Sequence, residues 1–86
     1  MAWMDLILDS TALREAARHG DIEAVRLGAH SIAVRAKRHG FHSLSHKAAS
    51  LVGQLRSEVD APPSAYAQSV EEIARQVDSI GRERGG

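Results

Sequence analysis

The residue best suited to chemistry in this chain is His30, which falls in the middle of a predicted helix. The apolar residues of that helix form one stripe, made of Ile22, Val25, Ala29, Ile32 and Ala36. At about 100° per residue, His30 lies about 120° from the centre of this stripe. An imidazole placed there faces water, where its neutral form is a nucleophile. The spacing therefore predicts a reactive histidine on the outer surface of a helix.

Apolar and basic residues surround His30 on the same predicted surface. Leu27 and Val34 each lie about one turn from it, and Arg26 and Lys37 lie within about 40° of it on the helical wheel. Apolar side chains that face water near a reactive group often mark an interface. We expect these four residues to form the rim of a docking surface for a partner protein.

The first half of the chain predicts two helices. One covers residues 3–19, although a cap at residues 9–11 would divide it into an N-terminal turn and a shorter helix. The next begins after Asp21, a good N-cap residue, and ends at Gly40. Its basic run of Arg35, Lys37 and Arg38 is typical of a solvated helix end, where cations suit the helix dipole.

The second half predicts two more helices and no strand. Apolar residues recur in steps of three and four from Phe41 to Leu55, and again from Tyr66 to Ile80. Prolines 62 and 63 separate these helices, and Gly81 is predicted to end the last one. Because the connections are short, neighbouring helices should run antiparallel. The predicted fold is all-α, an antiparallel up-down four-helix bundle.

Composition favours one small domain over residues 1–86. The 86 residues carry 11 basic and 11 acidic side chains and no cysteine, so neither a disulfide framework nor a thiolate metal site is available. The first eight residues are apolar, but they lack a basic leader and are followed by Asp9. We therefore expect neither a signal peptide nor a membrane span, and a soluble cytoplasmic protein.

The other four histidines are typical of helix ends and surfaces; they are His19, His39, His42 and His46. His42 and His46 lie one turn apart, a spacing that suits zinc or nickel, but no third ligand is evident nearby. We expect no metal site and no cofactor.

From Asp21 to Leu55 the chain resembles the histidine-containing phosphotransfer (HPt) domains of bacterial phosphorelays. The resemblance is carried, in the order and spacing of the family, by Asp21, Ala29-His30-Ser31-Ile32, Ala36, Gly40 and Leu44. In that family the histidine of the motif His-x-x-Lys-Gly exchanges a phosphoryl group with a response-regulator aspartate, and the matching residue is His30. The resemblance implies a four-helix phosphorelay protein whose partner is a response-regulator receiver domain or a hybrid histidine kinase.

Two residues depart from the family motif. Its lysine and glycine positions hold Ala33 and Val34, which we add to the candidate partner-binding residues. The family lysine is thought to balance the phosphate charge, and the glycine leaves room for the partner's active site. Arg26 and Lys37 are candidates to replace the missing cation, but no nearby glycine replaces the missing space.

Two other function classes compare with phosphotransfer, a binding module and a DNA reader. Loss of both motif residues favours a degenerate HPt-like module that docks on a kinase or receiver without carrying phosphate. The spacing from Ala36 to Ser45 also occurs in helix-turn-helix DNA readers. Arg35, His39 and His46 occupy positions that such a motif needs apolar, and the formal net charge is zero, so we expect no nucleic-acid partner.

Overall fold

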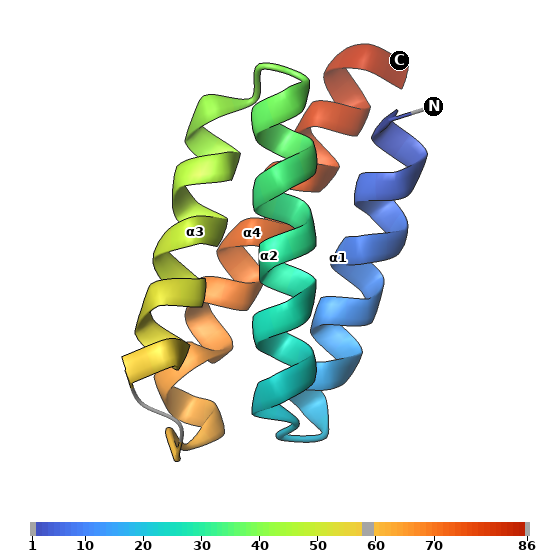
Figure 1. Cartoon of the computed structure of the whole chain (residues 1–86). Helices are drawn as coiled ribbons and strands as arrows, with labels where there is room; N and C mark the ends of the chain where they lie inside the picture. The colour runs from blue at the N-terminus through green and yellow to red at the C-terminus, as the bar shows by residue number, and fades with distance from the viewer. Residues whose placement is uncertain (1, 58–59, 86) are drawn as a thin grey trace.

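The computed structural model describes residues 2–57 and 60–85, which contain four α-helices and no strand. The helices are α1 (Ala2–Arg18), α2 (Ile22–Arg38), α3 (His42–Ser57) and α4 (Pro63–Gly85). Each helix packs against the next, and α1 also packs against α4, so the four form a closed ring (Figure 1). The predicted all-helical class with four helices is confirmed.

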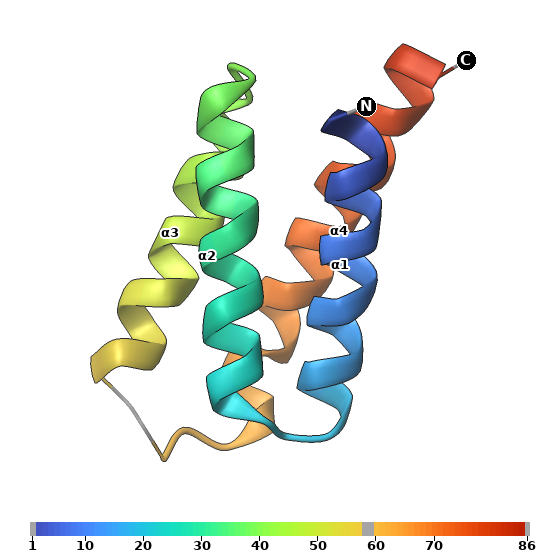
Figure 2. The ribbon, with the colours of Figure 1, turned by 45° about the vertical axis from the view of Figure 1, so that its right-hand side comes forward.

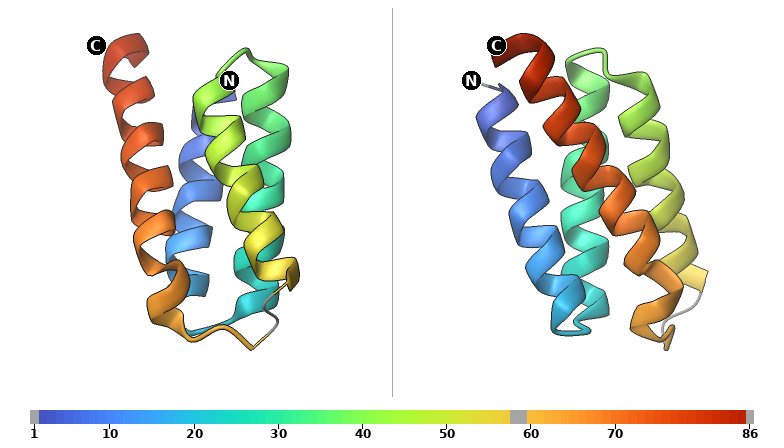
Figure 3. Two further views of the ribbon diagram at one scale, coloured as in Figure 1. Left: turned by 90° about the vertical axis from the view of Figure 1, so that its left-hand side faces the viewer. Right: turned by 180° about the vertical axis from the view of Figure 1, so that it is seen from behind.

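The bundle is elongated, with extents of 39 × 20 × 17 Å. Helices α1 and α4 lie on one side and α2 and α3 on the other (Figure 2), and in the view from behind α4 runs obliquely across the front of the bundle (Figure 3, right). No helix in the described part of the chain has the length and apolar character needed to cross a membrane.

Both ends of α2 follow the sequence signals. At its start the side chain of Asp21 accepts a hydrogen bond of 3.2 Å from the backbone N–H of Ala24. At its end Gly40 takes a φ of 81°, and the N–H of Phe41 donates to the carbonyl of Ala36 at 2.8 Å. This is the Schellman arrangement, in which a residue with positive φ stops the helix. The predicted limits of this helix are confirmed.

Helix α1 shows which of the two predicted forms the first helix takes, and α4 ends later than the sequence predicts. Helix α1 is unbroken, and Ser10 within it is 5% exposed, so residues 9–11 do not cap a second helix. The predicted stop at Gly81 is wrong, because α4 continues to Gly85. Gly81 has no positive φ, and a glycine inside a helix costs only about 1 kcal/mol.

One apolar core joins all four helices. Its fully buried side chains include Leu6 and Leu13 of α1, the α2 stripe of Val25, Ala29, Ile32 and Ala36, Leu44, Ala48, Leu51 and Leu55 of α3, and Tyr66, Ile73 and Val77 of α4. Burial of each large aliphatic side chain contributes about 1.5–3 kcal/mol. The predicted stripe of α2 is therefore the face that holds this helix in the bundle.

Charge pairs at the surface link α4 to its two neighbours. Arg14 of α1 lies 2.9 Å from Glu71, and Lys47 of α3 lies 2.9 Å from Glu72. The hydrogen bond and positive charge of Lys47 lower the pKa of the Glu72 carboxyl. Both pairs are in contact with solvent, the second only in part, so they help to orient α4 while the core supplies most of the stability.

Leu51→Ala tests the assignment of the core face. Leu51 is 1% exposed, so its truncation should lower the free energy of unfolding by about 2–5 kcal/mol. His46→Ala, at an exposed position of the same helix, should change it by less than about 0.5 kcal/mol. Denaturant titration measures both, and equal losses for the two variants would contradict the assignment.

Candidate functional site

The rotation of α2 places His30 on the surface. Its neighbours Ala29 and Ile32 are 0% exposed, whereas His30 is exposed. Because Ala29 and Ile32 pack in the core, the imidazole has a rigid base near the middle of a helix. The predicted outward position of His30 is confirmed.

His30 borders a shallow depression of about 320 Å³. The other residues that line it also belong to α2 and are Ser31, Val34, Arg35 and Arg38. They follow His30 toward the C-terminal end of the helix. The depression beside His30 is thus lined by a hydroxyl group, one branched apolar side chain and two guanidinium groups.

Arg35 connects this depression to α1 through two carboxylates. Its Nη1 atom lies 3.0 Å from Oδ2 of Asp5, and its Nε atom lies 2.9 Å from Oδ2 of Asp9. The Asp9 oxygen is buried and has no well-aligned hydrogen bond in the described structure, so its contact with Arg35 is a charge pair. Arg35 is therefore held toward α1 at one edge of the depression.

The two apolar residues of the predicted rim are exposed. Leu27 is 56% exposed and Val34 is 44% exposed, which places both among the large apolar side chains that face water. Two more such residues lie on α1, Met4 and Leu8. On α2, Leu27 and Val34 lie about one turn before and after His30, and exposed apolar side chains near a reactive group often mark a protein-docking surface.

The two predicted rim cations differ in their surroundings. Arg26 is half-buried and forms an ion pair with Glu23 one turn earlier on α2. Lys37 is exposed and forms no ion pair with any residue in the described ranges. Neither residue lines the depression beside His30. Arg26 is thus already neutralised, whereas Lys37 stays available to a partner.

The two positions that depart from the HPt motif face different directions. Ala33 is half-buried against the core, and its carbonyl accepts a hydrogen bond of 3.0 Å from the hydroxyl of Ser45 on α3. Val34, the next residue, lines the depression. Of these two residues, only Val34 lines the depression that His30 borders.

Sequence reasoning missed Arg38 as a neighbour of His30. It assigned the basic run at the end of α2 to the helix dipole, whereas the structure places Arg38 in the lining of the depression. The available signal was the spacing of His30, Val34 and Arg38, which follow each other in steps of four.

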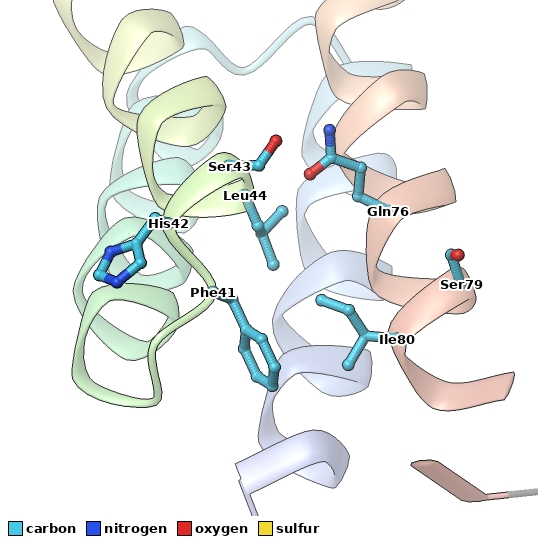
Figure 4. Close-up of a pocket in the computed structure, with 7 residues that line it drawn as sticks. All are labelled: Phe41, His42, Ser43, Leu44, Gln76, Ser79 and Ile80. Carbon is cyan, nitrogen blue, oxygen red and sulfur yellow. The ribbon is translucent and has the colours of Figure 1, made fainter. Parts of the chain in front are cut away.

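A second, more apolar groove lies between the start of α3 and the later part of α4, with a volume of about 270 Å³. Phe41, Leu44 and Ile80 point into it, whereas His42 points away (Figure 4). No residue of α2 lines this groove. Among the residues that the structure describes, no group of three or more histidine and acidic side chains is arranged to hold a metal ion.

Comparison of the chain with family models, with curated proteins and with solved structures finds no match. The candidate site is therefore assigned from the residues and geometry of this chain.

Leu27→Asp tests whether Leu27 belongs to the surface. Because this side chain is half exposed, the variant should unfold within about 0.5 kcal/mol of the parent protein. Val25→Asp is the matched control two residues earlier, where an unpaired charge would enter the core and should unfold the protein. Circular dichroism during denaturation measures both. Unfolding of Leu27→Asp would show that Leu27 is needed by the core.

Proposed function

We propose that this chain is a histidine phosphotransfer protein, an antiparallel up-down bundle of HPt type that carries a phosphoryl group on His30. The observation that carries the proposal is the exposure of His30 at the middle of α2, between the exposed apolar residues Leu27 and Val34. The up-down arrangement is supported by Figure 1, in which both termini lie at one end and the α1–α2 connection lies at the other.

The proposed reaction requires mainly that this chain holds the imidazole of His30 in a fixed position. A neutral ring nitrogen of His30 attacks the phosphorus atom of an aspartyl phosphate on the partner. The bond from phosphorus to the carboxylate oxygen breaks as the bond to nitrogen forms, and the proton on the other ring nitrogen leaves to water. Most catalysis of phosphoryl transfer is alignment and charge neutralisation, much of which the partner's active site supplies. A histidine on a rigid helix is therefore sufficient.

The proposed partner is a response-regulator receiver domain or a hybrid histidine kinase, and the proposed location is the cytoplasm. Leu27 and Val34 would pack against an apolar patch of the partner, while Lys37 would pair with its acidic rim. Arg26 would contribute from the opposite edge, as part of its pair with Glu23.

A second candidate is a binding module that docks on the same partners without carrying phosphate. The observation that favours it is Val34, which stands where the family motif has glycine and lines the approach to His30. Both candidates use the same surface, and they differ only in whether His30 is phosphorylated.

Transfer of radiolabelled phosphate separates the two candidates. The purified protein, incubated with a panel of phosphorylated receivers and autophosphorylated hybrid kinases, should become labelled. The label should be absent from His30→Gln and unchanged in His46→Gln, because His46 is an exposed histidine on α3. If the protein binds a receiver or kinase but no member of the panel labels His30, the binding module is the better account.

Replacement of Val34 tests the steric effect of the motif change. Val34→Ala should speed exchange with the receiver, and Val34→Gly should speed it further, by up to about tenfold, the equivalent of about 1.4 kcal/mol of relieved crowding. Glycine there should cost about 1 kcal/mol of stability. Single-turnover transfer rates measure the effect. Slower transfer in both variants would mean that the partner packs on Val34 and that its bulk aids docking.

A further inference from the structure

Two cations line the depression beside His30, and Arg35 is already paired whereas Arg38 is not. Arg35 carries one positive charge and lies against the two negative charges of Asp5 and Asp9, which leaves one negative charge in excess. An anion entering the depression would be repelled by this excess. Arg38 is the other charged residue in the lining, and among the described side chains no carboxylate pairs with it, so it is the cation of the depression that an entering anion can meet.

Arg38 is available to meet such an anion. It forms no ion pair with any side chain that the structure describes, and its own side chain is exposed. Helical side chains lean toward the N-terminus of their helix, a direction that takes the long side chain of Arg38 toward Val34, which lines the same depression as His30. A guanidinium group offers several N–H donors in a plane, which suits phosphate oxygens.

We propose that Arg38 is the cation that balances the phosphoryl group on His30, in the role for which the sequence suggested Arg26 or Lys37. The inference rests on the proposed function and adds the identity of the charge-balancing residue. Arg26 is already paired with Glu23, and Lys37 lies outside the depression. The phosphoryl group would extend from His30 into the depression, with the hydroxyl of Ser31 as a further donor at its edge.

The test uses phosphoramidate, a small phosphate donor that requires no partner protein. The ³¹P resonance of phosphorylated His30 is assigned by its loss in His30→Gln, and its chemical shift is then followed against pH. A nearby cation favours the doubly charged phosphoryl group and so lowers its pKa. Arg38→Gln should therefore raise the midpoint of this titration by a few tenths of a pH unit, as expected for a solvated ion pair.

Two further variants test whether a change in the midpoint comes from the charge at position 38. Arg38→Lys keeps the charge and should recover part of the shift. Arg56→Gln removes an equally exposed cation from the last turn of α3, and its midpoint should match that of the parent protein. A general effect of net charge would move the midpoint in Arg56→Gln as well.

The outcomes distinguish this inference from the proposed function. Equal midpoints for Arg38→Gln and Arg56→Gln, with His30 labelled, would overturn the role of Arg38 alone. A shift in Lys37→Gln without one in Arg38→Gln would assign the role to Lys37 and overturn it as well. If His30 is labelled neither by phosphoramidate nor by any receiver or kinase, the proposed function and this inference fall together.

Discussion

The rotation of α2 about its own axis is the constraint on which the surface around His30 depends. Val25, Ala29, Ile32 and Ala36 are all 0% exposed, so the helix has one face that the bundle can bury. Turning α2 by one residue, about 100°, would expose aliphatic side chains worth about 1.5–3 kcal/mol each and would move polar groups toward the core. The position of His30 in water is thus enforced by residues that are themselves buried in the core.

The same constraint explains why the site is a surface and contains no deep cavity. A helix fixed by its apolar stripe presents its opposite face as a row of side chains, here Leu27, His30, Val34 and Arg38. Arg35 on the flank binds the two aspartates of α1 and so joins this face to the neighbouring helix. Packing in the bundle holds α2 rigid, and the side chains that could react or bind are those of its exposed face.

The features that repeat along one helix were predictable from the sequence, and the features that depend on two helices were not. The apolar stripe, the Asp21 cap and the Gly40 stop involve residues within a few turns of each other. The pairing of Arg35 with Asp5 and Asp9 depends instead on the register of α1 against α2, across about 30 residues of chain. The spacing of His30, Val34 and Arg38 placed Arg38 on the same side of the helix, but only the pairing of Arg35 with α1 shows which of the two arginines is left unpaired. A signal within one helix can also mislead. Gly81 was predicted to end α4, but glycine permits a helix end and does not require one.

The central claim is that the exposed histidine of α2 carries phosphate, and its most direct test is to locate phosphate on the protein isolated from growing cells. Because the phosphorus–nitrogen bond is labile in acid, the protein would be purified, digested and analysed by mass spectrometry at neutral or alkaline pH. The account predicts a phosphoryl group on His30 and on none of the other four histidines. Phosphate on another histidine, or none on this protein while receivers in the same sample are phosphorylated, would contradict it.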